Sequence, residues 1–309
     1  MSLNIVFMGT PEFSIPTLRA VIKNKLQILS VYTQPPKKSK RGQKINSSPI
    51  EQYCKNNNFS FSNPASLNNE EELKNFKKLF PDLVIVVAYG KIIPKSFLNI
   101  PKLGFINIHA SLLPKWRGAA PIQRSIMNLE KETGFSIMKI GETLDTGPIC
   151  NLYKIKITDK DNAETISQKL SALAAEKILD NIDEILDGKI EFKEQNHNEA
   201  SYAAKIEKTE GQIKWNENAE NIIGKINGLY PSPGAFFIHK GERYKILEAT
   251  LASGNGEIGE VLDNYLEISC GNKKSIKVLE IQRQGKRPQN ISEFMLGSQI
   301  KKGSNLNNV

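Results

Sequence analysis

Apolar and mixed segments alternate along the first 190 or so positions in a way that predicts strands followed by helices. The stretch at 82–88, Asp-Leu-Val-Ile-Val-Val-Ala, is apolar on both faces, as a central parallel strand has to be. A long amphipathic pattern from about 163 to 186 predicts a helix that ends before Gly188. Further strands are expected at 3–8, 27–33, 104–109, 133–140 and 149–157, and helices near 15–22, 48–57 and 119–129. This order predicts an α/β domain with an open, mostly parallel, Rossmann-like sheet.

The pattern changes after Gly188. Residues 189–212 are polar and poor in large aliphatic side chains, which is typical of a linker. One helical pattern at 219–226 is then followed by short apolar segments separated by Gly and Asn, a spacing typical of a small β-barrel. Those segments lie at 235–239, 244–251, 256–262, 266–269 and 275–281. We therefore predict a catalytic domain at 1–188, a linker at 189–212 and an oligonucleotide-binding (OB)-like barrel at 213–309.

The strand at 105–109 departs from the apolar pattern on one face. In Phe-Ile-Asn-Ile-His, Ile106 and Ile108 face one side while Asn107 and His109 face the other. Open α/β sheets bind ligands at the carboxyl ends of their strands, which is where this pair lies. An amide and an imidazole can stabilise an oxyanion and move a proton. We interpret them as catalytic, the alternative being two hydrogen-bonded core residues.

Two turns qualify that interpretation. Asp145, in Leu-Asp-Thr-Gly after the strand at 133–140, could orient the imidazole, although taken alone the motif is an ordinary turn. Gly9-Thr-Pro-Glu-Phe follows the first strand and lacks the GxGxxG fingerprint, so it predicts a structural turn and disfavours a nicotinamide enzyme.

Composition narrows the class of protein. The chain has 309 residues, 39% of them hydrophobic, enough for a packed core, and no apolar stretch approaches the roughly 18–20 residues of a membrane span. Three separated cysteines and three histidines predict neither a disulfide framework nor a metal site. The first residues lead straight into a strand with no basic leader, so a cytoplasmic location is expected.

Charge indicates a polyanionic partner, nucleic acid first, because the formal net charge is +9. Compositional bias of the source genome explains the total about equally well. A local cluster is more informative, since no acid interrupts it between 34 and 46. It consists of Lys37, Lys38, Lys40, Arg41 and Lys44.

Taken together, Asn107, His109, Asp145 and the segment from Ser111 to Ile122 resemble the 10-formyltetrahydrofolate-dependent formyltransferases. The Asn-His-Asp set is shared widely in that family, whereas Trp-Arg-Gly-Ala-Ala-Pro-Ile within the segment is narrower and indicates the members that act on tRNA. The similarity spans nearly the whole chain. One departure is Ala110, where the family commonly has Gly; the added methyl group is small.

The resemblance implies a reaction and a set of roles. A formyl group would pass from 10-formyltetrahydrofolate, as co-substrate, to the α-amino group of methionine on initiator tRNA, for translation initiation and without a metal. Asn107 and protonated His109 would donate to the oxyanion, and Asp145 would hold His109. The folate site would be lined by Ser111, Leu112, Leu113 and Pro114, with a pterin pocket at Val87, Ala88, Tyr89 and Gly90. The acceptor end of the tRNA would meet Lys38, Lys40, Arg41 and Lys44.

Other functions stay open at this point. One is a formyltransferase for a small amine, or a 10-formyltetrahydrofolate hydrolase; the basic loop and the second domain argue against it, because a small acceptor needs neither. Another is a non-catalytic RNA-binding relative, which the complete Asn-His-Asp set argues against. We expect a monomer. Any basic stripe on the barrel would come from Lys273, Lys274, Lys277, Arg283, Lys286 and Arg287.

Overall fold

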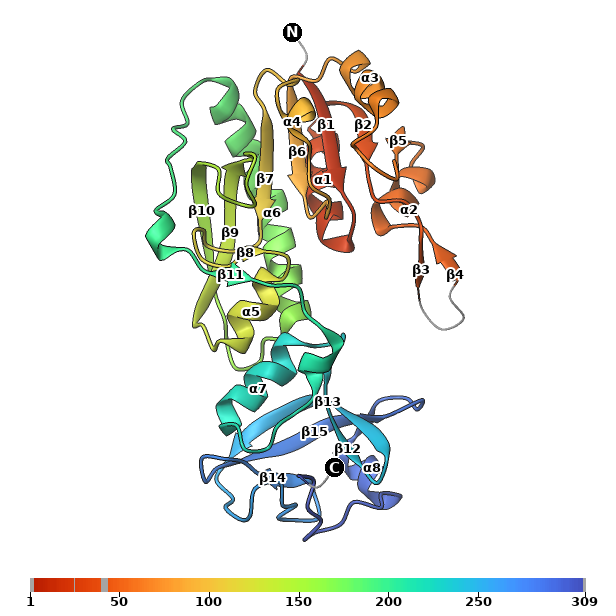
Figure 1. The fold of residues 1–309 in the computed structure, drawn as a ribbon, viewed down its shortest axis with the longest axis vertical. Coiled ribbons are helices and arrows are strands. Elements are labelled where there is room, and N and C mark those ends of the chain that lie inside the picture. The colour runs from red at the N-terminus through yellow and green to blue at the C-terminus, as the bar shows by residue number, and fades with distance from the viewer. Residues whose placement is uncertain (1–2, 25, 40–43, 308–309) are drawn as a thin grey trace. The chain divides into compact units, whose positions relative to one another are not determined.

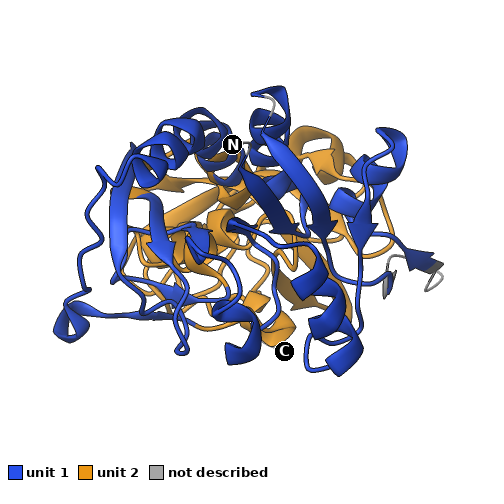
Figure 2. Ribbon diagram, turned by 90° about the horizontal axis from the view of Figure 1, so that it is seen from above, with its two compact units in different colours: residues 1–119, 134–155, 167–203 blue, residues 120–133, 156–166, 204–309 orange. Residues whose placement is uncertain are grey.

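The computed structural model describes residues 3–24, 26–39 and 44–307. The chain divides into two compact units, which we describe separately (Figure 2). The first contains residues 1–119, 134–155 and 167–203, and the second contains residues 120–133, 156–166 and 204–309. The second unit therefore takes two segments from the part of the chain that precedes residue 188.

A seven-stranded sheet in the order β10-β9-β7-β6-β1-β2-β5 forms the centre of the first unit (Figure 1). Its strands are β1 (Asn4–Gly9), β2 (Gln27–Tyr32), β5 (Phe61–Ser62), β6 (Leu83–Val87), β7 (Phe105–His109), β9 (Glu132–Lys139) and β10 (Ile149–Lys156). Pairing is parallel from β5 through β2, β1 and β6 to β7, and antiparallel between β7 and β9. The predicted open, mostly parallel α/β sheet is confirmed.

Helices cover this sheet because its central strands are apolar on both faces and have to be shielded from water. Val6 and Met8 of β1 pack in one cluster with Phe76 of α3 (Glu70–Lys78) and Phe97 of α4 (Lys95–Leu98). On α6 (Ala163–Leu186), Ser171 donates its hydroxyl to the carbonyl of Phe13, 2.7 Å away. The first unit also holds α1 (Ile15–Lys23), α2 (Pro49–Asn56) and the 3-10 helices η1 (Glu12–Ser14) and η2 (His197–Glu199).

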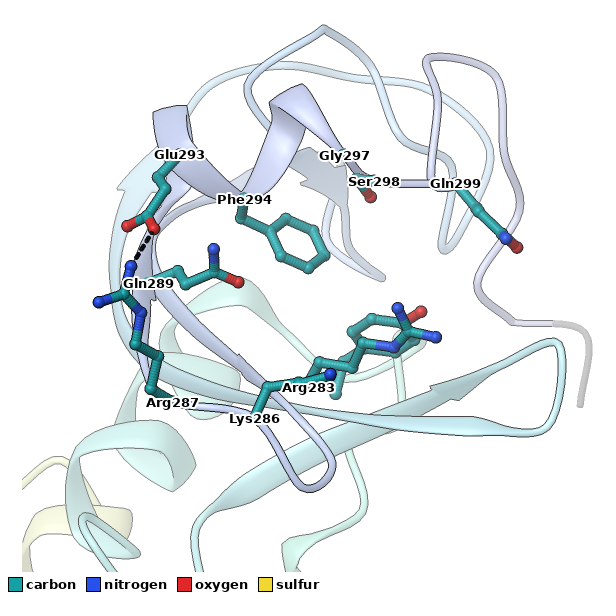
Figure 3. Close-up of a pocket in the computed structure, with 10 residues that line it drawn as sticks. Arg283, Lys286, Arg287, Gln289, Glu293, Phe294, Gly297, Ser298 and Gln299 are labelled. Atoms are coloured by element: carbon teal, nitrogen blue, oxygen red, sulfur yellow. Dashed lines mark hydrogen bonds and ion pairs between the residues drawn. The ribbon is translucent and has the colours of Figure 1, made fainter.

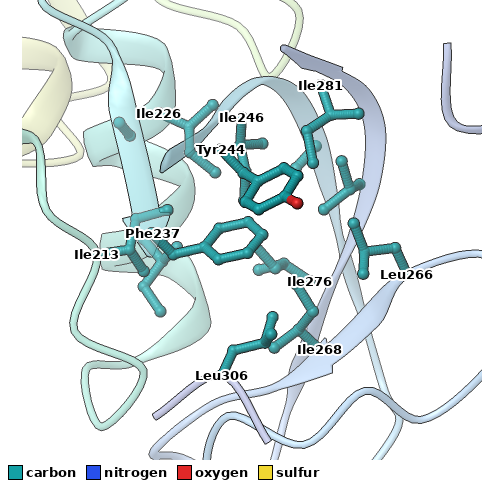
Figure 4. Packing of buried hydrophobic residues seen from close by; sticks show 14 of the residues in the cluster. Ile213, Ile226, Phe237, Tyr244, Ile246, Leu266, Ile268, Ile276, Ile281 and Leu306 are labelled. Atoms are coloured by element: carbon teal, nitrogen blue, oxygen red, sulfur yellow. The ribbon is translucent and has the colours of Figure 1, made fainter. Parts of the chain in front are cut away.

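The second unit is built on an antiparallel sheet in the order β12-β13-β15-β14, with β16 paired to β15. Its apolar core includes Trp215, Phe237 and Tyr244, and the rings of Phe237 and Tyr244 stack 5.4 Å apart (Figure 4). The elements are α5 (Pro121–Met127), η3 (Lys208–Gly211), α7 (Ala219–Gly228), β12 (Ala235–His239), β13 (Glu242–Ala252), β14 (Glu267–Ser269), β15 (Ser275–Arg283), β16 (Gln289–Asn290) and α8 (Ile291–Leu296). The predicted antiparallel β structure is confirmed, and its closure into an OB-type barrel stays a prediction.

The strand predicted at 256–262 is wrong. Only isolated bridges form there, from Glu260 to Asn305 and from Val261 to Ile268. Gly259 has a φ of +81°, which turns the chain out of an extended path. The Glu260 carboxylate also accepts the amide of Glu257 at 2.9 Å, so a side chain takes the place of a partner strand.

Several stretches without a predicted element have regular structure, including α3, α4, α8, the basic loop and the predicted linker. The basic loop contains an antiparallel hairpin of β3 (Lys37–Ser39) and β4 (Lys44–Asn46). The predicted linker carries β11 (Tyr202–Ala203), which pairs in parallel with β8 (Arg117–Gly118). Figure 1 shows β8 and β11 side by side.

Candidate active site

Asn107 and His109 lie near the carboxyl end of β7, between the parallel neighbour β6 and the antiparallel neighbour β9. Asn107 pairs with Val86 and Met138 across these two strands. It is the one residue of β7 that is not buried, whereas His109 is only 6% exposed. Among the described residues, the Asn107 side chain makes no hydrogen bond. A partly exposed strand position whose side-chain amide has no hydrogen-bond partner is suited to bind a ligand.

Both ring nitrogens of His109 have polar neighbours. Nδ1 lies 3.6 Å from Oδ2 of Asp145, within ion-pair distance. Nε2 lies 3.0 Å from the carbonyl oxygen of Trp116, to which it donates when it carries a proton. A carboxylate on one nitrogen and a donor position at the other is the arrangement expected of an imidazole that stabilises charge or transfers a proton.

Asp145 is held in an unusual backbone conformation. Its φ is +52°, and its Oδ2 accepts the amide of Gly118 at 2.9 Å. Two residues later, a Cβ on Gly147 would lie only 1.9 Å from the carbonyl oxygen of Lys139. The Asp-Thr-Gly turn therefore packs directly on the end of β9, and that contact requires its glycine.

The segment predicted to line the folate site, from Ser111 to Pro114, is held by hydrogen bonds to a buried serine of β9. Ser136 of β9 is fully buried; its hydroxyl donates to the Ser111 carbonyl at 2.6 Å and accepts the Leu113 amide at 2.9 Å. The peptide bond between Leu113 and Pro114 is cis. Ser111 and Leu113 are buried while Leu112 and Pro114 are partly exposed, so the segment presents alternate residues. Sequence reasoning missed Ser136, which lies opposite His109 in the strand register.

The predicted pterin turn continues from β6, the strand beside β7. Ala88 and Gly90 are exposed, whereas Val87 is buried. Ser14 and Thr10 from the first strand–helix turn donate their hydroxyls to the carbonyls of Val87 and Tyr89 at 2.6 and 2.8 Å. The Gly9-Thr-Pro segment thus supports this turn.

The Tyr89 side chain does not line an open surface. It is 1% exposed and packs in the apolar cluster of the first unit, where burial raises the pKa of Tyr89 to about 12. The main-chain carbonyls of this turn bind a side chain from elsewhere in the unit: Gln34 Nε2 donates to the carbonyls of Tyr89 and Gly90 at 2.8 and 2.9 Å. Gln34, just before the basic loop, was also missed by sequence reasoning.

The structure gives a partial view of the predicted tRNA loop. In the backbone pairing of β3 with β4, Lys38 lies opposite Ile45 and Lys44 lies opposite Ser39. Lys40 and Arg41 lie outside the described residues. At the base of the hairpin, the ammonium of Lys37 donates to Gln34 Oε1, which links the hairpin to the turn at 89–90.

The second unit carries two open cavities next to basic side chains. One, of about 320 Å³, is lined by Arg283, Lys286 and Arg287 together with Phe294, whose ring points into it (Figure 3). The other, of about 300 Å³, is lined by Arg243, Lys245 and Arg283. Neither cavity includes Asn107, His109 or Asp145.

Acidic partners offset much of the predicted basic stripe on this unit. Lys274 pairs with Glu220 at 2.5 Å and Arg287 with Glu293 at 2.8 Å, while Arg283 pairs with Glu242. Lys286 has no ion-pair partner among the residues that the structure describes. Three of the six cations of the predicted stripe therefore lie beside a carboxylate.

The described part of the chain contains neither a cluster of metal-binding side chains nor a membrane-spanning helix. Over residues 3–24, 26–39 and 44–307, no group of three or more His, Cys, Asp and Glu side chains is arranged to hold a metal ion. Within the same ranges, no helix has the length and apolarity needed to span a bilayer.

Comparison with known families matches both parts of the chain. A model described as formyl transferase matches residues 3–182, and one described as formyl transferase, C-terminal domain, matches residues 205–299. A methionyl-tRNA formyltransferase of Pelagibacter ubique is 67% identical over 310 residues, covering 100% of both chains. Another, of Thermodesulfovibrio yellowstonii, is 42% identical over 98% of each chain.

Solved structures show the same fold at lower identity. An N-formyltransferase from Helicobacter canadensis, in complex with folinic acid and dTDP-3-aminofucose, superposes with a TM-score of 0.67 at 21% identity, over 91% of this chain and 99% of that one. A methionyl-tRNA formyltransferase from Clostridium thermocellum superposes with a TM-score of 0.58 at 20% identity, over 80% of this chain and 93% of that one.

Proposed function

Because the chain belongs to the formyl transferase family, with methionyl-tRNA formyltransferases as full-length relatives, we propose that it formylates the α-amino group of methionine on initiator tRNA. It is an enzyme of the formyltransferase class. The observation that carries the choice of acceptor is the 67% identity over both whole chains to a methionyl-tRNA formyltransferase. The sugar-bound neighbour is only 21% identical and supports the fold alone.

The proposed chemistry assigns a role to each polar group at the end of β7. The methionyl amine attacks the formyl carbon, and negative charge develops on the formyl oxygen. The bond between the formyl carbon and N10 of the folate then breaks, and tetrahydrofolate leaves with the proton that the amine gives up on that nitrogen. The Asn107 amide and the His109 imidazole donate hydrogen bonds to that oxygen, which stabilises the transition state more than the ground state. Asp145, 3.6 Å from His109 Nδ1, balances the positive charge of a protonated imidazole.

10-Formyltetrahydrofolate is the proposed formyl donor. The residues present fit a flat ligand: Ala88 and Gly90 leave an exposed, nearly side-chain-free turn beside β7, and Leu112 and Pro114 are accessible on the facing loop. These residues would bind and orient the co-substrate, and no step of the proposed chemistry requires a metal. Within this turn, the exposed residues Ala88 and Gly90 offer the binding surface, because the Tyr89 ring is buried and its carbonyl already accepts Thr10 and Gln34.

The tRNA is proposed to contact two basic regions. The hairpin loop with Lys38, Lys40, Arg41 and Lys44 would hold the acceptor end, and the second unit, with Arg243, Lys245 and Lys286 at its cavities, would contact the phosphate backbone. A small amine would leave both regions without a ligand. We further propose that the enzyme acts as a monomer in the cytoplasm, where translation initiates.

The test offers the enzyme labelled 10-formyltetrahydrofolate with methionyl-initiator-tRNA and, in parallel, glycinamide ribonucleotide. Label transferred to the tRNA alone is expected. Label on the small amine would retain the chemistry and reject the acceptor. Free formate without labelled acceptor would indicate a hydrolase, and no turnover together with tRNA binding would indicate a non-catalytic RNA-binding protein.

A further inference from the structure

A buried arginine lies close to the candidate active site in the first unit. Arg117 of β8 is 2% exposed, and its Nε and Nη2 donate to Oε1 of Gln195 at 3.1 and 2.6 Å. Nη2 also lies 3.1 Å from Nδ1 of His197, which has to accept there because a guanidinium only donates. Burying a charged guanidinium costs free energy unless its N–H groups find partners. The hydrogen bonds to Gln195 and His197 offset part of that cost and fix the orientation of Arg117.

Gln195 uses both ends of its amide. It is 6% exposed, although it comes from the polar stretch that follows the long helix. Its Nε2 donates to the main-chain carbonyls of Asp145 at 2.9 Å and Gly147 at 2.7 Å, while its Oε1 receives Arg117. Only an amide both accepts and donates in this way; a glutamate of the same length accepts only.

The turn that carries Asp145 is consequently held at two points by one dipeptide. Gly118 donates its amide to the Asp145 carboxylate at 2.9 Å. Arg117, the residue before it, fixes the glutamine that binds the Asp145 carbonyl. The dipeptide itself is secured by pairing with β11, where Gly118 lies opposite Ala203.

We propose that Gln195 is a positioning residue for the reaction, and that it keeps the Asp145 carboxylate beside His109 Nδ1. Arg117 sets the orientation of the Gln195 amide. Gln195 acts through Asp145 and His109 and touches neither substrate. This inference rests on the proposed function, because it assigns Gln195 to the same formyl transfer.

The decisive variant is Gln195→Glu. The carboxylate keeps a partner for Arg117, so the protein is expected to fold, with a melting temperature lowered by the loss of two buried hydrogen bonds. It cannot donate to the carbonyls of Asp145 and Gly147, so the turn is released. We expect kcat to fall about 10- to 100-fold, as a misplacement of roughly 1 Å can cause, with KM for folate and tRNA nearly unchanged.

Gln168→Glu is the matched control, since Gln168 is exposed on α6 of the same unit and the change in charge is identical. It should behave as wild type. If Gln195→Glu does not fold, Gln195→Asn keeps the amide but is one methylene too short to reach both sides, and the same loss of kcat is expected. Wild-type kcat in a folded variant, or a change confined to the melting temperature, overturns the proposal.

A spectroscopic readout separates this inference from the proposed reaction. The chain has three histidines, so the imidazole Cε1–H signal of His109 can be assigned by substitution. At one fixed pH this signal should move in Gln195→Glu and Gln195→Asn and stay in place in Gln168→Glu. If wild type formylates no tRNA, the proposed function fails, and the His109 signal still decides whether Gln195 positions the pair.

Discussion

At the scale of residues, His109 and Asn107 differ in what a substrate has to displace. Nε2 of His109 already lies 3.0 Å from the Trp116 carbonyl, so a developing oxyanion has to share or replace that contact. The Asn107 amide has no competing partner among the described residues and is partly exposed. Asn107 is therefore the donor that is available as soon as a formyl oxygen arrives.

We expect Asn107→Ala and His109→Ala each to lower kcat by about 10²–10³, the usual effect of losing one oxyanion donor. Turnover measured at saturating folate and tRNA checks this. Thermal unfolding of both variants shows whether the fold survives. A folded variant that retains the wild-type rate would exclude that residue from catalysis.

Gly147→Ala should destabilise the protein by about 1–3 kcal/mol, the range for overpacking, because the new Cβ would lie 1.9 Å from the Lys139 carbonyl oxygen. The Asp145 turn should shift with it, and activity should fall. Gly141→Ala is the control, since a Cβ there has no heavy atom within 4 Å. Denaturant unfolding of the pair measures the difference, and equal stabilities would show that the turn can move aside at little cost.

At the scale of elements, one ion pair ties α5 to η3 within the second unit. Arg124 Nη1 and Nη2 donate to the two carboxylate oxygens of Glu210 at 2.6 and 3.0 Å. These hydrogen bonds hold the pKa of Glu210 below its usual range. A depressed carboxylate pKa stabilises the fold above the pKa of the unfolded chain, about 4.3, and this contribution disappears as the pH falls through the folded value.

We therefore expect Glu210→Gln to lower the free energy of unfolding at pH 7, and the gap from wild type to narrow as the pH drops below about 4.3. Urea unfolding at several pH values measures the gap. Glu257→Gln, at an exposed position of the same unit, should leave stability unchanged throughout. A gap independent of pH would mean that Glu210 acts through packing.

Regular elements were predictable from the sequence where burial imposes a period. The strand at 105–109 and the helix at 163–186 are both found because alternating or 3.6-residue spacing reflects which face is buried. The stretch at 256–262 has a similar apolar content, yet Gly259 bends it and Glu260 binds the backbone. Apolar content alone does not reveal such local competition for main-chain hydrogen bonds.

Candidate site residues could be chosen from the sequence only where the residue type and its position suggest a catalytic role. Asn107 and His109 stand out because polar side chains on one face of a central strand are unusual. Asp145 lies in an ordinary turn motif and was singled out only as a partner for the imidazole. Ser136 and Gln195 reach the same region from distant parts of the chain, and their roles depend on hydrogen bonds to main-chain groups. Spacing along a sequence carries no information on such contacts, so only the folded arrangement identifies them.

At the scale of the whole molecule, the net charge of +9 predicts how binding responds to salt. Each phosphate contact contributes a slope of roughly −0.9 to log affinity against log salt for duplex nucleic acid. We expect a steep slope for tRNA, and in Arg41→Ala a slope smaller by about 1, with folate binding unchanged. Titrations of tRNA over a series of NaCl concentrations test this. A tRNA affinity that does not change with salt concentration would show that the basic loop does not bind the tRNA.

The pairing of β8 with β11 also bears on the order in which the enzyme matures during translation. His109 and Asp145 leave the ribosome well before Gln195 and Ala203, and domains fold as their residues emerge. A nascent chain that has emerged only to Gly188 contains all strands of the central sheet, together with His109 and Asp145. It still lacks Gln195 and β11, which hold the turn that carries Asp145. We therefore expect full activity only after residues 195–203 have been synthesised and β11 has paired with β8.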